Sequence, residues 1–311
     1  MSPTQNRVNG ADEVYMKPST RLRKLISQDG VCVQAPGVYD GICARIAIEQ
    51  GFEYQSGAMT TAARLGKADL AFASLNDFAL NAQMIANIDP RVPLIADADT
   101  GFGSPPNIAR MVQMYDQCGV AGFHIEDQVA NKRCGHLEGK QLVDMETWKS
   151  RIRACVLGRE AIYGHSDIVI IARTDALAVE GFESALNRLL EARDCGADMA
   201  FLEAIETEEQ IKHAVQALAP MPLMINCVSL GKTPWFPPKK LAELGLAIYP
   251  GAAGKTVIHA IRRSYKLLLE KGEDDAATMG LEPRGFFDVM GLQKEMEIDR
   301  LAGGNAFGHM A

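Results

Sequence analysis

The sequence predicts a (β/α)₈ barrel, the TIM-barrel fold. Along most of the 311 residues, short apolar runs alternate with longer amphipathic stretches, and polar or glycine positions bound each run. Such runs are typical of buried parallel strands, and eight of them alternating with helices over one domain length is the pattern of a closed barrel. A doubly wound open sheet is the alternative, but no glycine-rich dinucleotide loop follows the first strand.

The runs that predict the strands are residues 32–35, 54–56, 93–96, 122–125, 168–172, 199–202, 222–225 and 246–249. Between them the apolar residues recur at helical spacing. For example, Ile211, Ala214 and Leu218 share one face of a stretch that ends at Pro220. Nearly every predicted strand is followed by such a stretch, which favours a parallel sheet with its helices outside.

Three segments are expected along the chain. Residues 1–19 are polar and lack periodicity, which predicts a flexible arm. Residues 20–273 form the barrel domain, which opens with a short basic helix at 20–28. Residues 274–311 carry one more apolar pattern and predict a C-terminal helical extension, packed outside the barrel or against a partner subunit.

The composition excludes several classes of protein. The chain has 32 Lys and Arg against 39 Asp and Glu, a formal charge of −7, which argues against a general nucleic-acid binder. An apolar content of 47% excludes a largely disordered chain, and no apolar run approaches the ~18 residues of a membrane helix. The seven cysteines are scattered without a CxxC pair, as in a reducing compartment. A cytoplasmic protein is therefore expected.

An acidic cluster is predicted where the strands end, because chemistry gathers at the carboxyl ends of barrel strands. Asp97 and Asp99 occupy alternate positions, so on an extended strand both side chains face the same way, and Glu126 ends the next strand. Such oxygen donors suit Mg²⁺ or Mn²⁺. The alternative is that the two aspartates only form a turn or cap a helix before Thr100.

Two further features have both a functional and a structural interpretation. Cys134 stands between Arg133 and Gly135 in a loop over the barrel mouth, where a thiol with a lowered pKa acts as an acid or a nucleophile; the alternative is a solvated basic loop. Arg173 ends an apolar strand, where it binds a substrate carboxylate or pairs with Glu203 or Asp175.

Residues 56–58 offer a hydroxyl and backbone N–H groups for an oxyanion. His124 is expected in the core or the helix layer.

Together these residues resemble the isocitrate lyase / phosphoenolpyruvate mutase superfamily, from residue 37 to about residue 304. The most specific match is Lys132-Arg133-Cys134-Gly135-His136, which is similar to the signature of the lyase branch. Residues 97–103, 124–128 and 172–176 support it, in the family's order and spacing. The resemblance implies a barrel of this superfamily whose C-terminal helices are swapped between subunits of a homotetramer.

The resemblance also implies roles for particular residues. Mg²⁺, or Mn²⁺, is held by Asp97 and Asp99, while Glu126 and Asp69 act largely through water. Cys134 is the general acid on a loop that closes over a small carboxylic acid, and Arg173 and Glu203 are the other catalytic residues. The residues implied to contact substrate are Tyr54, Ser56, Gly57, Ala58, Asp97, Gly135, His136, Arg173, Asn226, Val228, Lys255 and Arg284.

The resemblance implies a carbon–carbon lyase that cleaves a 2-hydroxy di- or tricarboxylic acid of the 2-methylisocitrate or 2,3-dimethylmalate type into an oxoacid, such as pyruvate, and a second carboxylic acid. Hydrolysis or decarboxylation of oxaloacetate on the same site is the alternative. The oxaloacetate acetylhydrolases carry a serine near the end of strand eight, where this chain has Pro250. Met59 replaces a small residue usual in the lyases. A degenerate barrel that serves as a scaffold or binding module is a third interpretation. The intact set of candidate site residues argues against it, namely Asp97, Asp99, Glu126, Cys134 and Arg173.

Overall fold

The computed structural model describes residues 15–28, 30, 32–52, 55–56, 59–135, 137–236, 241 and 246–306. Within them, eight parallel strands form one sheet in the order β1-β8-β7-β6-β5-β4-β3-β2. The strands are β1 (Val33–Pro36), β2 (Gln55–Ser56), β3 (Leu94–Asp97), β4 (Gly122–Glu126), β5 (Val169–Thr174), β6 (Met199–Leu202), β7 (Leu223–Asn226) and β8 (Leu246–Tyr249). Every predicted strand is present, and the eighth begins and ends at the predicted residues.

The strand order shows that the sheet closes on itself. From β2 to β8 each strand pairs with the next one in the chain, and β1 pairs with β8, with Val33 opposite Leu246. β1 and β2, at the two ends of this order, also contact one another. A doubly wound sheet would reverse its strand order part-way, so the predicted barrel is confirmed and the open-sheet alternative is excluded.

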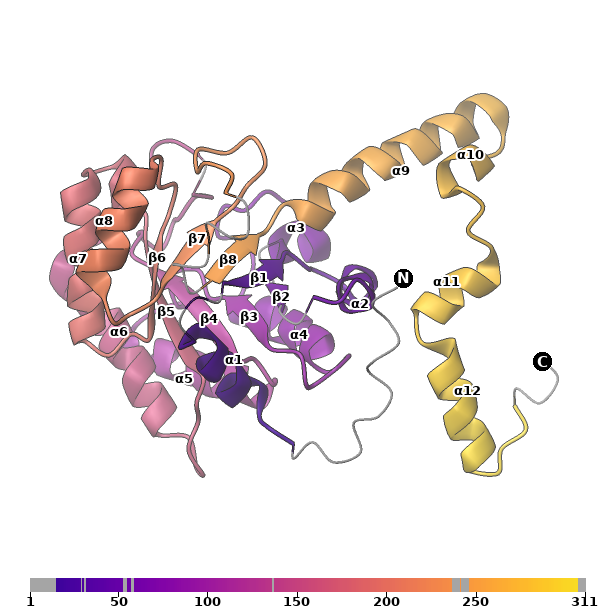
Figure 1. The fold of residues 1–311 in the computed structure, drawn as a ribbon, viewed down its shortest axis with the longest axis horizontal. Coiled ribbons are helices and arrows are strands. Elements are labelled where there is room, and N and C mark those ends of the chain that lie inside the picture. Colours follow the sequence, from indigo (N-terminus) through magenta and orange to yellow (C-terminus); the bar gives the residue numbers. More distant parts are fainter. Residues whose placement is uncertain are drawn as a thin grey trace.

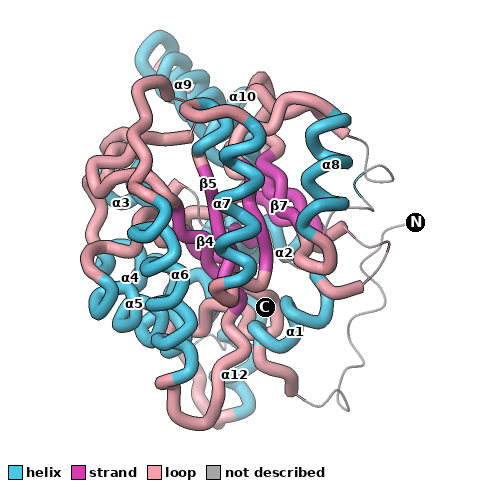
Figure 2. Tube along the Cα trace, turned by 90° about the vertical axis from the view of Figure 1, so that its left-hand side faces the viewer, coloured by secondary structure: helices cyan, strands magenta, loops and turns pink. Residues whose placement is uncertain are grey.

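Helices surround the barrel, as the alternation predicts (Figures 1 and 2). Those around the sheet are α2 (Gly41–Glu49), α3 (Thr60–Leu65), α4 (Leu75–Ala86), α5 (Pro105–Gln117), α6 (Met145–Glu160), the short 3₁₀ helix η2 (Ala176–Ala178), α7 (Phe182–Asp194) and α8 (Glu208–Leu218). Side-chain caps fix several helix starts. Asp40, for example, accepts a hydrogen bond from the Cys43 backbone at the start of α2. No described helix is long and apolar enough to cross a membrane.

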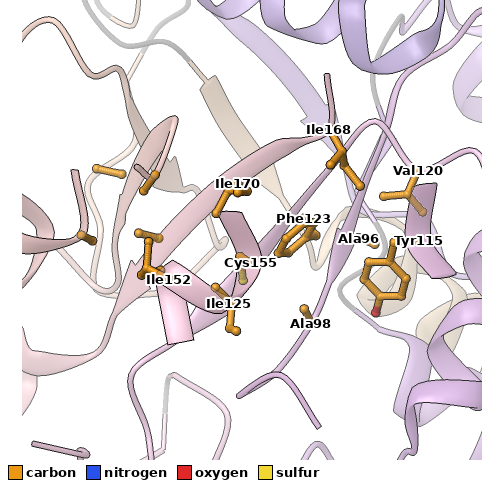
Figure 3. Close-up of a cluster of buried hydrophobic side chains, with 14 of the residues drawn as sticks. Ala96, Ala98, Tyr115, Val120, Phe123, Ile125, Ile152, Cys155, Ile168 and Ile170 are labelled. Atoms are coloured by element: carbon orange, nitrogen blue, oxygen red, sulfur yellow. The ribbon is translucent and has the colours of Figure 1, made fainter. Parts of the chain in front are cut away.

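Two apolar layers support the sheet. The outer layer lies between strands and helices, where Phe123 and Ile170 on the sheet lie beside Ile152 and Cys155 of α6 (Figure 3). The inner layer fills the barrel, and the first helix, α1 (Pro18–Ile26), closes its amino-terminal end with the fully buried Leu22. α1 begins two residues before the predicted helix. Because the lower barrel is packed with apolar side chains, polar groups can gather only at the other end.

The C-terminal part leaves the barrel wall. α9 (Ala252–Lys271) runs away from β8, and α10 (Asp275–Thr278), α11 (Pro283–Val289) and α12 (Leu292–Leu301) follow it (Figure 1). α11 returns to contact α2. Apolar side chains stay exposed along α9, namely Val257, Ile258, Ile261, Tyr265, Leu268 and Leu269. The eighth helix therefore does not cover the barrel of its own chain.

Candidate active site

Polar side chains gather at the carboxyl ends of the strands, opposite the end that α1 closes. Each of them is more than nine-tenths buried, and they are Asp97 of β3, Glu126 of β4, Arg173 of β5, Glu203 after β6 and Asn226 of β7. Burial of this many ionisable groups is expensive unless they pair with one another or with a ligand. The structure therefore brings together residues that the sequence placed at separate strand ends.

Asp97 and Asp99 meet through a turn. β3 ends at Asp97, whose Oδ1 accepts a hydrogen bond from the Asp99 backbone N–H over 2.8 Å, and Asp99 adopts a left-handed φ of 43°. Strand alternation, from which the sequence predicted their common direction, is thus the wrong reason. A short aspartate side chain that captures the N–H two residues later folds the backbone into a turn. Both carboxylates are buried at this edge.

Arg173 is the central cation of the site. Its guanidinium lies 3.0 Å from Asp175, 3.3 Å from Glu126 and 3.4 Å from Glu203, and it stacks over the Phe201 ring. The structural alternative left open by the sequence is therefore present with both proposed partners. Burial alone would lower the pKa of Arg173, but the surrounding carboxylates raise it well above the ordinary value. A fixed positive charge stands at the mouth.

Lys132 is a second buried cation, and the sequence indicated it only as part of the lyase motif, without a role in the site. Its ammonium lies 2.6 Å from Asp99 Oδ1 and 2.7 Å from Asp69 Oδ1, and its side chain is only 2% exposed. Burial opposes its charge, yet the nearby carboxylates, Asp97 and Glu126 first among them, raise its pKa. Asp69, which follows α3 at the edge of the mouth, thereby joins the predicted acidic cluster through Lys132.

The carboxylates of the cluster differ in their affinity for protons. Burial, together with the charge of Asp97, raises the pKa of Asp99 to about 7. Burial also raises the pKa of Glu126 well above its usual range, against the effect of Arg173. Burial acts on Asp97 in the same direction, but His124, Lys132 and Arg173 outweigh it and lower the pKa. In the absence of a metal ion, Asp97 therefore gives up its proton more readily than Asp99 or Glu126 does.

His124 lies inside the barrel, beneath the acidic cluster. Its Nδ1 is 3.5 Å from Asp97 Oδ1, and its ring meets the Phe201 ring edge-on. The prediction of a place in the core or the helix layer holds only in part. His124 stands two residues before Glu126 on β4, and residues two apart on a strand face the same side. Burial lowers the pKa of His124, against the effect of Asp97.

The loop with Cys134 is packed directly onto the mouth. The Cys134 backbone N–H donates to the Asp69 carbonyl over 3.2 Å, and the thiol is half-buried and not in a disulfide. A Cβ atom on Gly135 would lie 2.6 Å from Arg173 Nη2 and 2.7 Å from Glu203 Cδ. The backbone next to Cys134 therefore touches the ion pair at the ends of β5 and β6.

The other predicted site residues fall into three groups. Asn226 donates to both carboxylate oxygens of Glu203, over 3.3 and 3.2 Å, and its own buried Oδ1 accepts no hydrogen bond from a described residue. Val228 follows it at the same end of β7. Lys255 and Arg284 belong to α9 and α11 in the C-terminal segment, where Lys255 donates to the Ser229 carbonyl. Ser56 ends β2, while Tyr54, Gly57, Ala58 and His136 lie outside the described residues.

The donor chemistry of the mouth fits a divalent cation of the Mg²⁺ or Mn²⁺ type. The described residues contain no complete cage of three Asp, Glu, His or Cys side chains. Mg²⁺ does not need one, since it is usually held by one or two carboxylates, with water and substrate oxygens. Asp97 and Asp99 offer two buried carboxylates. Glu126 Oε2 is buried, pairs with Arg173 over 3.3 Å and accepts no hydrogen bond from the described residues.

The comparisons with known proteins agree with this geometry. The family model described as phosphoenolpyruvate phosphomutase matches residues 22–268, which covers the whole barrel. The chain belongs to this family. It is 36% identical to 2-methylisocitrate lyase of Aeropyrum pernix, over 93% of this chain and 94% of the relative. It is 34% identical to 2,3-dimethylmalate lyase of Eubacterium barkeri, over 91% and 98%. The chain is thus an enzyme, a carbon–carbon lyase of this family.

Two solved structures resemble the fold over nearly its full length. A crystal structure of 2,3-dimethylmalate lyase has 44% sequence identity and a TM-score of 0.89, and covers 95% of this chain and 99% of its own. Oxaloacetate acetylhydrolase in complex with the inhibitor 3,3-difluorooxalacetate also has 44% identity and a TM-score of 0.89, covering 94% and 99%. Overall likeness therefore does not separate the two activities, and the residues of the site must do so.

Proposed function

We propose that this chain cleaves the carbon–carbon bond of a 2-hydroxy di- or tricarboxylic acid of the 2-methylisocitrate or 2,3-dimethylmalate type. The products are an oxoacid, such as pyruvate, and a second carboxylic acid, and Cys134 is the general acid. The observation that carries the proposal is the contact of Gly135 with Arg173 and Glu203. It brings the backbone next to Cys134 against a buried guanidinium suited to a substrate carboxylate.

The residues of the chain divide the reaction between them. A carboxylate of the site takes the substrate's hydroxyl proton. A carbonyl group then forms as the carbon–carbon bond breaks, and the electron pair of that bond stays on the carbon of the departing fragment. Cys134 gives its S–H proton to that carbon. Arg173 binds a carboxylate of the substrate, and Asn226 holds Glu203 beside it by donating to both of its carboxylate oxygens. Asp97 and Asp99 would hold Mg²⁺ or Mn²⁺, with Glu126 and Asp69 nearby, and the ion would supply positive charge to the oxoacid oxygens.

Hydrolysis of oxaloacetate is the second candidate, because the oxaloacetate acetylhydrolase structure is as similar to this chain as the lyase structure is. The position after β8 separates the two. The resemblance implies a serine there in the oxaloacetate acetylhydrolases, whereas this chain has Pro250, which has no hydroxyl and whose carbonyl is packed against Gly37. The Pro250→Ser variant is therefore expected to gain release of oxalate and acetate from oxaloacetate that the parent chain lacks.

The test supplies purified protein and Mg²⁺ with 2-methylisocitrate, 2,3-dimethylmalate or oxaloacetate, and follows the products by NMR. Release of pyruvate from a branched acid, lost in Cys134→Ser, is the expected result. Cys118→Ser is the matched control, since Cys118 is a half-buried thiol at the end of α5. Oxalate and acetate from oxaloacetate, with the branched acids untouched, would overturn the proposal.

The assembly is proposed on separate grounds. A cavity of about 610 Å³ lies against the outer side of β1 and β8, lined by Pro36, Phe52, Trp235 and Tyr249 among others. It lies where an eighth barrel helix would pack, yet α9 runs away from it with an exposed apolar face. We therefore propose a homotetramer with exchanged C-terminal helices. Light scattering should give four times 33.8 kDa, and removal of residues 274–311 should lower the mass of the assembly.

A further inference from the structure

The loop that carries Cys134 leaves and re-enters the barrel through a fixed neck, formed by residues 127–129 and 141–143. The Val129 N–H donates to the Gln141 carbonyl, and the Val143 N–H to the Asp127 carbonyl, both over 2.9 Å. Gln128 and Leu142 face each other in an isolated antiparallel bridge. Because backbone hydrogen bonds join the two strands of the neck, the backbone positions of the residues in and beside it are fixed.

Gln128 reaches from one side of the neck to the residue before Cys134. Its Nε2 donates to the Arg133 carbonyl over 2.8 Å, and its Oε1 accepts from the Arg133 N–H over 3.1 Å. The same Nε2 also donates to Glu126 Oε1 over 3.0 Å. Gln128 is fully buried, so its amide links the loop backbone to a carboxylate of the acidic cluster.

Lys140 reaches from the other side to the residue after Cys134. Its ammonium donates to the Gly135 carbonyl over 2.6 Å and to Asp175 Oδ1 over 2.9 Å, and its side chain is 3% exposed. Asp175 in turn holds Arg173. Burial raises the pKa of Asp175, but Arg173 and Lys140 outweigh it and lower the pKa, so the link is ionic.

We propose that Gln128 and Lys140 are positioning residues that together fix the Cys134 thiol over the mouth. They bind the peptide groups on either side of Cys134, whose own N–H is held by the Asp69 carbonyl. Each also binds an acidic group of the site, Gln128 on the side of Glu126 and Lys140 on the side of Arg173. The loop backbone is thus tied to both halves of the site. The catalytic meaning of this placement rests on the proposed function, whereas the placement itself can be measured without turnover.

The experiment compares Lys140→Met and Gln128→Met, which keep the length of each side chain and remove its hydrogen bonds. Lys149→Met on α6 is the matched control, because Lys149 also pairs with carboxylates but lies outside the loop. Alkylation of Cys134 by iodoacetamide is followed by mass spectrometry of its peptide, beside kcat and KM for the preferred branched acid. Thermal unfolding reports whether each variant folds.

Alkylation of Cys134 should be about tenfold faster in both variants, since each loses a buried hydrogen bond to the loop backbone. kcat should fall on the order of 100-fold, the effect of a reacting group misplaced by about 1 Å, while KM stays within about threefold and Lys149→Met behaves as the parent. If either variant folds, it decides the test. Parental alkylation and kcat in a folded variant would overturn the proposal, and so would failure of both variants to fold, which would make the two residues structural. If the parent chain cleaves none of the acids, but the variants are alkylated at Cys134 faster than the parent, the positioning is supported and only the proposed function is refuted.

Discussion

Gly135→Ala is the sharpest perturbation of the site, because it adds one methyl group where there is no room for it. The new Cβ would lie 2.6 Å from Arg173 Nη2 and 2.7 Å from Glu203 Cδ, whereas ordinary contacts begin at about 3.5 Å. Something must therefore move by about 1 Å. Arg173 is held by three carboxylates inside the barrel, so the surface loop moves instead and carries Cys134 with it.

A displacement of about 1 Å in a reacting group costs on the order of 100-fold in rate, so kcat should fall by that factor. Gly135 does not have a left-handed φ, so alanine brings no backbone strain, and the cost in stability is that of overpacking, about 1–3 kcal/mol. The melting temperature should therefore fall by roughly 2–4 °C for each kcal/mol. The assay measures kcat for the preferred branched acid and the melting temperature. Gly41→Ala, whose Cβ would meet only ordinary contacts at 3.6 Å and beyond, is the control. A kcat within about threefold of the parent would refute the reasoning.

Three further perturbations test the cluster and the fold. The pKa of Asp99 is raised to about 7 in the folded chain, against about 3.9 when unfolded. The native state therefore binds the extra proton between these values, and the free energy of unfolding falls as pH rises through that window. In EDTA, Asp99→Asn should flatten this fall, by on the order of 3 kcal/mol between pH 4 and 8; parallel curves for the two proteins would contradict it. Mg²⁺ at 100 times its Kd should add about 2.7 kcal/mol of stability to the parent and none to Asp97→Asn, as read by thermal unfolding. Gly158→Ala should cost about 1–3 kcal/mol in urea unfolding, because its Cβ would lie 2.7 Å from the Ala109 Cα of α5; an unchanged midpoint would show that α5 and α6 can separate freely.

Much of the barrel was predictable because its signal is local. A buried parallel strand needs apolar residues on both faces, so runs such as Val169–Ala172 can be recognised in the sequence as strands. The polar residue at the end of each run then indicates which residues lie at the mouth of the barrel. The direction of His124 followed from the same rule and was missed, since it shares the face of Glu126 two residues later. Sequence periodicity contained this information.

Other features of the site depend on contacts that no local pattern encodes. Lys132 stands in a basic loop, and its pairing with Asp69, 63 residues earlier in the chain, exists only once the barrel has closed. Nothing in the sequence around Lys140 distinguishes it from an exposed lysine, and its burial against Asp175 is known only from the structure. The turn at Asp99 is set by a side chain–backbone hydrogen bond that competes with the strand. Long-range pairing and local turn chemistry therefore account for what the sequence did not reveal.

The closure of the barrel floor by α1 has a consequence for how the chain is made. Arg23 of α1 pairs with Asp198 just before β6, 175 residues later, and β1 forms its backbone pairing with β8, the last strand. At a synthesis rate of about 5–20 residues per second, roughly 10–35 s pass between the translation of Arg23 and that of Asp198. During that time the inner layer lacks the residues that β6, β7 and β8 contribute, so Leu22 and the inner face of β1 have only part of their final partners. A growing chain of this kind is at risk of aggregation until its last strand emerges, so its yield in cells should depend on chaperones that hold the unfinished barrel.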